Sequence, residues 1–255
     1  MSAKPTIIMI GIQGKAKQAQ RAFEAYGLPV TFYPVQRYEP FPEDKLVQQL
    51  DVLPEQSWLV FSSSYAVKLL RTIKLRRYRW WQTARVVAVG NTTRRAVEKY
   101  FPRKTPEFTV GTFQEALAGI RQSGADVQRV IHLTSLQSFA NLTPDIPENV
   151  LLHRIPIYQL QVNKKLGGRV PEPLQRDNVY LVVPSPSAIN AAVELWGKQF
   201  LKPDLKVFTL GKTTAEYVYT HYHMPEIYFP GVPELEQVAR LIVEMTKTPN
   251  SQEIV

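Results

Sequence analysis

The stretch Arg85-Val86-Val87-Ala88-Val89-Gly90-Asn91-Thr92-Thr93 carries the local signals of a strand, a turn and a helix start. Small and β-branched residues running into a Gly predict a buried strand and a tight turn. The hydroxyl residues that follow are typical of a helix N-terminus. The same pattern returns 121 positions later, at Lys206-Val207-Phe208-Thr209-Leu210-Gly211-Lys212-Thr213-Thr214. Two such units at a fixed spacing predict an internally duplicated architecture.

Other segments repeat at nearly the same offset. Trp58–Val67 (WLVFSSSYAV) matches Tyr180–Ile189 (YLVVPSPSAI), and Pro34-Val35 is echoed by Pro156-Ile157. Strand-like and helix-like patterns alternate throughout, which predicts parallel sheets with helices on both faces. With right-handed crossovers, the predicted fold is α/β, built as two doubly wound parallel-sheet domains.

The repeat also predicts how the chain is shared between domains. Each repeat contains a β-α-β piece that is followed by a polar stretch, at 36–42 and at 159–173, and these stretches are interpreted as crossovers. Residues 1–37 and 160–255 are then predicted to form one discontinuous domain, and residues 38–159 the other. A contiguous split near residue 125 is the simpler alternative.

Composition narrows the functional classes. The 255 residues are 44% hydrophobic and include no Cys, so disulfides, thiolate catalysis and Cys-bound zinc are excluded. No apolar run is long enough to span a bilayer, and the first residues lack the features of a signal peptide. A cytoplasmic enzyme or binding protein fits best. The net charge of +9 favours an anionic partner, with a solubility charge as the alternative.

Hydroxyl side chains follow the predicted strands. In open parallel sheets, ligands bind beyond the carboxyl ends of the strands, and helix N-termini there favour carboxylates or phosphates. Simple helix capping by Ser and Thr is the alternative reading of each cluster. Five clusters at one predicted sheet edge favour an anion-binding cleft. The clusters are Ser62, Ser63 and Ser64; Thr92 and Thr93; Thr134 and Ser135; Ser185 and Ser187; Thr213 and Thr214.

Three other motifs are weak. Gly211-Lys212-Thr213 ends like a phosphate-binding loop, but Lys206 stands where that loop needs a Gly. His221 and His223 have no further ligand at metal spacing, so no metal site is predicted. The basic stretch Lys68–Arg79 could meet nucleic acid through phosphate contacts and its aromatics, although a solvated helix face is the more frequent meaning of such a run.

A set of segments resembles the uroporphyrinogen-III synthase family, in the family's order and over nearly the whole chain. The segments are Trp58–Val67, Val86–Thr93 (VVAVGNTT), Ile155–Gln159 (IPIYQ), Val182–Ala188 (VVPSPSA) and Val207–Thr214 (VFTLGKTT). The resemblance implies two α/β domains joined by a two-stranded linker, with the active site in the cleft between them. It also implies a monomer that needs no metal and no organic cofactor.

The family resemblance implies a lyase that acts on hydroxymethylbilane, a linear tetrapyrrole with eight carboxylates. The substrate loses its terminal hydroxyl as water, and the resulting azafulvene cation attacks the substituted carbon of the last pyrrole. A spiro intermediate then breaks and recloses with ring D inverted. Without enzyme the bilane closes uninverted, so the protein must favour one closure over the other.

The resemblance also implies site residues. Tyr158 matches the family's cleft tyrosine and is the candidate to assist departure of the hydroxyl, with a linker aromatic that packs the domain junction as the alternative. The hydroxyls that match those holding substrate acid groups are Ser63, Thr93, Ser185, Ser187 and Thr214. Their neighbours Ser64, Thr92 and Thr213 are included in the predicted site. Lys206 matches a basic position before the second turn, with a solvated lysine at the start of a strand as the alternative.

Two segments depart from the family pattern. Many members carry an Arg soon after the first strand, where this chain has Gly11-Ile12-Gln13. Many carry a Gly or Arg where this chain has Thr134-Ser135. A non-catalytic relative that binds a tetrapyrrole or another polyanion is therefore the second hypothesis, and a nucleic-acid-binding module is the third.

Overall fold

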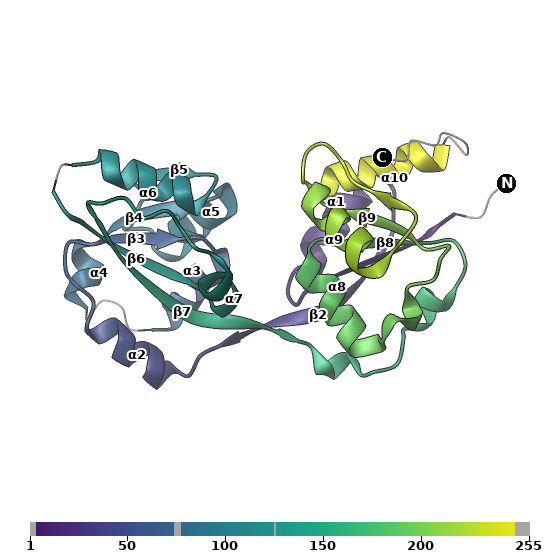
Figure 1. Cartoon of the computed structure of the whole chain (residues 1–255), viewed down its shortest axis with the longest axis horizontal. Helices are drawn as coiled ribbons and strands as arrows, with labels where there is room; N and C mark the ends of the chain where they lie inside the picture. Colours follow the sequence, from purple (N-terminus) through teal and green to yellow (C-terminus); the bar gives the residue numbers. More distant parts are fainter. Residues whose placement is uncertain (1–3, 74–77, 125, 248–255) are drawn as a thin grey trace. The chain divides into compact units, whose positions relative to one another are not determined.

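The computed structural model describes residues 4–73, 78–124 and 126–247 (Figure 1). Its internal contacts divide the chain into two compact units. Unit 1 comprises Met1–Tyr38 and Gln161–Val255, and unit 2 comprises Glu39–Leu160.

Unit 1 is a sheet with the strand order β10-β9-β8-β1-β2, in which neighbouring strands are parallel. Its elements are β1 (Thr6–Ile12), α1 (Ala16–Glu24), β2 (Val30–Pro40), η2 (Lys164–Leu166), η3 (Glu172–Gln175), β8 (Val179–Val183), α8 (Pro186–Trp196), η4 (Lys198–Phe200), β9 (Lys206–Thr209), α9 (Lys212–Tyr222), β10 (Ile227–Tyr228) and α10 (Leu235–Lys247).

Unit 2 has the strand order β7-β6-β3-β4-β5, again with parallel pairs. Its elements are α2 (Glu43–Asp51), β3 (Trp58–Phe61), α3 (Ser64–Thr72), α4 (Arg79–Thr83), β4 (Arg85–Val89), α5 (Asn91–Tyr100), β5 (Phe108–Val110), α6 (Phe113–Gln122), β6 (Gln128–Ser135), α7 (Leu136–Asn141) and β7 (Val150–Val162). The prediction of parallel α/β sheets is confirmed, whereas the internal duplication stays a prediction.

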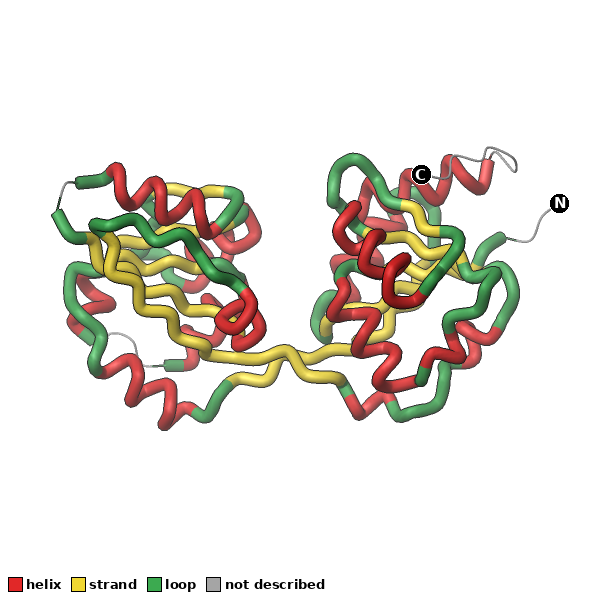
Figure 2. The backbone as a smooth tube through the Cα atoms, viewed as in Figure 1, coloured by secondary structure: helices red, strands yellow, loops and turns green. Residues whose placement is uncertain are grey.

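The core of unit 1 follows from the two-residue period of its strands. Ile8 and Ile10 of β1 pack with Trp196 of α8, while Ile7 and Met9 point to the other face, toward α1 and α10. Both faces of the sheet are therefore covered by helices (Figure 2), which explains why the strands read as almost continuous apolar runs.

The core of unit 2 is built the same way. Trp58 and Val60 of β3 pack on the α6 side with Leu117 and Ile120. Leu59 and Phe61 alternate with them and are fully buried. The buried strands fix the sheet, and the sheet fixes where the residues after each strand emerge.

Two long strands, β2 and β7, each begin in one unit and end in the other. β2 starts in unit 1 and ends at Pro40, so the stretch predicted as a polar crossover from residue 36 continues as strand. β7 likewise runs on to Val162. Within unit 1 the Asn163 N–H donates to the Val35 carbonyl (2.8 Å), and within unit 2 the Phe41 N–H donates to the Ile157 carbonyl (3.1 Å).

The basic stretch at 68–79 is not one continuous helix. α3 ends at Thr72 and α4 begins at Arg79. Lys74, Arg76 and Arg77, which that prediction included, lie outside the described residues. Tyr78, Trp80 and Trp81 are only 6%, 2% and 7% exposed, because they fill the core of unit 2. They cannot stack on bases, so the nucleic-acid hypothesis loses the aromatics on which it relied.

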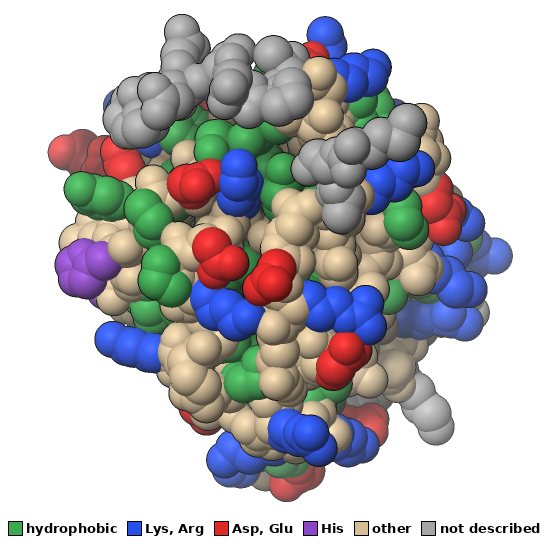
Figure 3. Space-filling view, turned by 90° about the vertical axis from the view of Figure 1, so that its right-hand side faces the viewer, with side chains coloured by type: hydrophobic (Ala, Val, Ile, Leu, Met, Phe, Trp, Pro, Cys, Tyr) green, Lys and Arg blue, Asp and Glu red, His purple; other side chains and the backbone are tan. Residues whose placement is uncertain are grey.

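Charge is mixed on the surface shown in Figure 3, where Lys and Arg side chains are interspersed with Asp and Glu. Several of the basic residues pair within their own helix, as Arg94 does with Glu98 (2.9 Å) and Arg240 with Glu244 (2.9 Å). Part of the net positive charge is thus balanced locally. In the described part of the chain, the helices are too short or too polar to cross a membrane.

Replacing Leu59 with Ala tests the buried sheet. Leu59 is fully buried in β3, so Leu59→Ala should lower the free energy of unfolding by about 2–5 kcal/mol through lost burial and a residual cavity. Urea denaturation followed by far-UV circular dichroism measures this. Val52→Ala is the control, because Val52 is 81% exposed and its truncation should change stability by less than about 0.5 kcal/mol. Equal effects of the two changes would contradict the assignment of β3 to the core.

Candidate functional site

Unit 2 has a point at which the chain leaves neighbouring strands in opposite directions. β3 and β6 lie side by side, but β4 and β5 continue outward from β3 while β7 lies beyond β6. Such a switch point is where parallel sheets leave room for ligands. The register pairs Phe61 with Leu133, so Ser62 and Ser63 emerge beside Thr134 and Ser135.

A buried histidine lies below this edge. His132 is fully buried, its Nε2 is 2.8 Å from Ser62 Oγ, and its ring stacks on Phe113 at 3.9 Å. Burial, with a smaller contribution from the charge of Arg154, lowers the pKa of His132 to about 3. The imidazole is therefore neutral at physiological pH and holds the Ser62 hydroxyl by a neutral hydrogen bond.

Tyr158 of β7 lies at the same edge, between two helix starts. Its hydroxyl is hydrogen-bonded to the hydroxyls of Ser63 and Ser135. Each serine also caps a helix: Ser63 Oγ accepts from the Tyr65 N–H (3.1 Å), and Ser135 Oγ accepts from the Ser138 N–H (3.1 Å). The caps fix both serine oxygens, and the serines in turn fix the phenol.

The environment of Tyr158 keeps its phenol protonated. Only 5% of the residue is exposed, and this burial raises the pKa of the phenol, an effect partly opposed by the two serine hydroxyls. The Tyr65 ring packs edge-on against it, with the ring centroids 4.9 Å apart. A protonated phenol in a dry setting is a hydrogen-bond donor rather than a base.

The capping alternative describes the serines well. Ser63 and Ser135 cap α3 and α7, and in unit 1 Ser185 caps α8 through the Ala188 N–H (3.3 Å). Ser187 is exposed, and its Oγ lies 3.1 Å from that of Ser185. Ser64 is the first residue of α3 and is partly exposed. These serine hydroxyls therefore stabilise the helix starts at this edge of the sheet, and they also line the edge itself.

The two threonine turns are different, because their helices begin at Gly. Gly90 is the N-cap of α5 and Gly211 the N-cap of α9, and neither has a side chain to accept the first-turn N–H groups. Gly90 also needs its residue type for its backbone, since φ is +82°. Helix starts of this kind present N–H groups and the positive end of the dipole to an anion.

The threonines divide by exposure. Thr93 and Thr214 are 4% and 8% exposed and pack inward in the first turns of α5 and α9. Thr92 and Thr213 are exposed at the same helix starts. The structure therefore brings each Thr pair to the carboxyl end of its strand, as predicted, with one hydroxyl of each pair at the surface.

A pocket opens at this edge of unit 1. It has a volume of about 510 Å³ and lies at the carboxyl ends of β8, β9 and β10. Lys212 is exposed at the pocket and pairs loosely with Glu216 (3.7 Å), so it adds positive charge beside the N-terminus of α9. The lining residues are Pro184, Leu210, Gly211, Lys212, Thr213, Thr214, Phe229, Pro230, Gly231 and Pro233.

Lys206 is not part of this group. It is the first residue of β9 and pairs in register with Tyr180, at the amino end of the sheet. The hydroxyl residues lie at the carboxyl end, about 10 Å away along the strand at 3.3 Å per residue. Its ammonium instead pairs with Glu226 (3.2 Å). The fold thus separates Lys206 from the residues with which the sequence grouped it.

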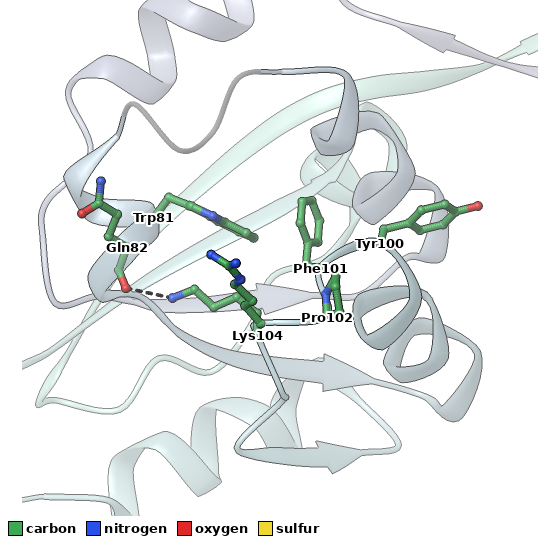
Figure 4. A pocket seen from close by; sticks show the side chains of 7 residues that line it. Trp81, Gln82, Tyr100, Phe101, Pro102 and Lys104 are labelled. Carbon is green, nitrogen blue, oxygen red and sulfur yellow. Dashed lines mark hydrogen bonds between the residues drawn. The ribbon is translucent and has the colours of Figure 1, made fainter.

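Another pocket of unit 2 lies apart from the predicted residues. It has a volume of about 350 Å³ and is walled by Trp81 and Phe101, while Tyr100 points away from Trp81 (Figure 4). The Lys104 ammonium donates to the carbonyls of Gln82 (3.0 Å) and Ala84 (2.8 Å). Across the described ranges, no three His, Asp or Glu side chains gather as metal ligands would.

The sequence analysis did not include His132 in the candidate site. The available signal was a single titratable residue inside the otherwise apolar run Val130–Leu133. It also placed Ser62 and Ser135 in hydroxyl clusters without assigning them to the site, because their contacts to His132 and Tyr158 are made across strands.

The family model for "Uroporphyrinogen-III synthase HemD" matches residues 17–239. The chain belongs to the uroporphyrinogen-III synthase family. A comparison with curated proteins found no match.

Solved structures of this family share the fold. Uroporphyrinogen-III synthetase from Helicobacter pylori is 16% identical with a TM-score of 0.63, over 95% of this chain and 100% of that one. A mutant uroporphyrinogen III synthase from the extremely thermophilic bacterium Thermus thermophilus is 16% identical with a TM-score of 0.58, over 95% and 98%. At this identity the likeness shows the fold alone.

The low pKa of His132 predicts a loss of stability in acid. Folded His132 stays neutral down to about pH 3, whereas the unfolded chain binds its proton below about pH 6.5. Stability is therefore lost as pH falls between these values, by about 3 kcal/mol from pH 7 to pH 4. This loss should be absent in His132→Asn and present in the exposed control His153→Asn, as measured by urea unfolding at both pH values. The same pH dependence in His132→Asn would contradict the buried, neutral assignment.

Proposed function

We propose that the chain is a uroporphyrinogen-III synthase, a lyase that closes hydroxymethylbilane with loss of water and inversion of ring D. Family membership over residues 17–239 supports the reaction class. The observation that carries the proposal is the Tyr158 hydroxyl held between Ser63 and Ser135 at the switch point of unit 2.

In the proposed reaction, Tyr158 donates a hydrogen bond to the departing hydroxyl of the substrate. The departing hydroxyl takes up the phenol proton and leaves as water, which gives an azafulvene cation. The proton released when the ring closes restores the phenol, and a positioned acid lowers the barrier to water loss. The raised pKa keeps the phenol protonated, and the capped serines hold its oxygen without reorganisation. The hydrogen bond between Ser62 and His132 joins the ends of β3 and β6, which carry Ser63 and Ser135.

We propose that substrate carboxylates bind at the N-termini of α5 and α9. The Gly caps of both helices leave first-turn N–H groups for an anion, and the pocket at α9 adds Thr213 and Lys212. A substrate with eight carboxylates suits such sites, and the net charge of +9 favours its approach.

Selectivity for the inverted product is then a matter of differential stabilisation. Each tenfold preference over the uninverted closure requires about 1.4 kcal/mol between the two transition states. Fixing several carboxylates limits the shapes the bilane can adopt, and this positioning requires neither a strong nucleophile nor a metal.

The proposal includes the organisation of the chain. We propose that units 1 and 2 are the two domains of a duplicated protein, that β2 and β7 form the two-stranded linker, and that the protein acts as a cytoplasmic monomer. The discontinuous division of the chain and the matching strand orders support the first part.

A second candidate is a non-catalytic relative that binds a tetrapyrrole. The observation in its favour is the 5% exposure of Tyr158, which limits access to the phenol. Turnover separates the two candidates, because a binder forms the complex without producing the inverted isomer.

The isomer formed from hydroxymethylbilane generated in place tests the function. The protein should produce uroporphyrinogen III above the enzyme-free background, and Tyr158→Phe should lower kcat by about 10²-fold or more, because the hydroxyl that assists water loss is removed. Chromatography of the oxidised products gives the isomer ratio. Tyr26→Phe, at an exposed tyrosine, is the matched control and should keep full activity. Isomer I alone, formed at the spontaneous rate by folded protein, would refute the synthase and leave the binder.

A charge placed at the α9 N-terminus tests carboxylate binding. Thr213→Glu puts a carboxylate among the N–H groups proposed to bind substrate, so KM should rise about tenfold by like-charge competition. Thr213→Gln has a similar size without the charge, so its KM should rise much less than that of Thr213→Glu. Steady-state kinetics at low salt gives both values. A KM that rises equally in both variants would point to a steric effect and exclude the anion site.

A further inference from the structure

The short helix α7 exposes apolar side chains. Leu136, Phe139 and Leu142 are 37%, 42% and 37% exposed, and they recur every three residues along α7 and its C-cap. We call these three side chains the α7 apolar surface. Each of the six residues of α7 is at least partly exposed, which is unusual for a helix that carries Leu and Phe.

The equivalent helix of unit 1 behaves differently. α1 connects β1 to β2, as α7 connects β6 to β7. α1 buries Ala19, Ala22 and Phe23 in a core shared with α10. The α7 apolar surface has no comparable burial within the described residues, although it contains residues of the same kind.

Polar contacts hold α7 in place instead. The Gln137 side chain exchanges two hydrogen bonds with the Leu160 backbone (2.9 and 3.1 Å). The Arg154 guanidinium donates to the carbonyls of Ser138 and Leu142, each at 2.7 Å. With the Ser135 cap, these bonds fix α7 without using its apolar side chains.

The α7 apolar surface is continuous with the candidate site. Ser135, the N-cap of α7, is the residue whose hydroxyl binds Tyr158, and Leu136 follows it directly. The Cζ atom of Arg154 lies 5.3 Å from the centroid of the Phe139 ring, so the apolar surface has a cation at its edge. A ligand with flat apolar rings and acidic substituents fits such a surface. Its rings can lie on the apolar side chains while its acid groups face the cation and the polar cluster.

We propose that the α7 apolar surface binds the pyrrole rings of the tetrapyrrole. This inference rests on the proposed function and adds a contact to the rings, where the helix N-termini supply contacts to the carboxylates. Burying these side chains under a ring removes apolar area from water, which favours binding. Three side chains are too few for a stable protein interface, which takes about 800 Å² on each partner.

The test compares Phe139→Ser and Leu136→Ser with Leu151→Ser. Leu151 is also exposed, at 52%, but lies at the amino end of β7, so it controls for losing a surface leucine. We expect the α7 variants to raise KM for hydroxymethylbilane about fivefold with kcat changed less than about twofold. They should weaken binding of uroporphyrin III, followed by its fluorescence, by a similar factor. Phe139→Leu should restore both values, and the melting temperature should stay constant.

The two readouts separate this inference from the proposed function. If wild type produces isomer III but Phe139→Ser keeps its KM and its affinity, the inference is overturned and the synthase stands. If wild type produces only isomer I yet binds uroporphyrin more tightly than the α7 variants do, the synthase fails and the ring contact stands. Sedimentation that shows a wild-type dimer, dissociated by the α7 changes, would assign the surface to self-association and overturn the inference.

Discussion

The parallel register between β3 and β6 is the constraint on which the candidate site depends. Pairing Phe61 with Leu133 brings the segments after both strands to one level, and Ser62, Ser63 and Ser135 emerge there together. A slip of one residue would turn Ser62 and His132 to opposite faces of the sheet and break their hydrogen bond. The buried apolar residues on both faces therefore hold the polar residues of the candidate site in register.

The buried polar groups at this edge lower the stability of unit 2. His132 Nδ1 and Thr134 Oγ1 are buried and have no hydrogen-bond partner among the described residues. Each such group costs about 1–3 kcal/mol relative to a satisfied one. Ser63 and Ser135 avoid this cost because each serine hydroxyl has two partners. Each one caps a helix and also binds Tyr158. The same two serine hydroxyls thus cap the helices that follow β3 and β6 and position the phenol of Tyr158.

The two units hold their equivalent helices, α1 and α7, in different ways. In unit 1, α1 packs its apolar face into a core shared with α10, whereas in unit 2 its counterpart α7 is fixed by Gln137 and Arg154. Helices held by a few polar bonds open more readily than helices packed in a core. The difference lies next to Tyr158, in the region proposed to bind substrate, and binding regions are often placed on the less rigid parts of a fold.

The sequence by itself determined the parallel α/β class, the hydroxyl residues at the strand ends and the family resemblance, because strand runs, glycine turns and helix caps are local signals. Tertiary structure decided which of those residues meet. Lys206 falls at the opposite edge because it begins its strand, and Tyr78, Trp80 and Trp81 are buried in the core, away from solvent. His132 joins Ser62, and Ser135 joins Tyr158, only across neighbouring strands. Local patterns place residues along one element, but contacts between residues about 70 and 23 positions apart depend on register and burial, which arise only when the whole sheet is packed.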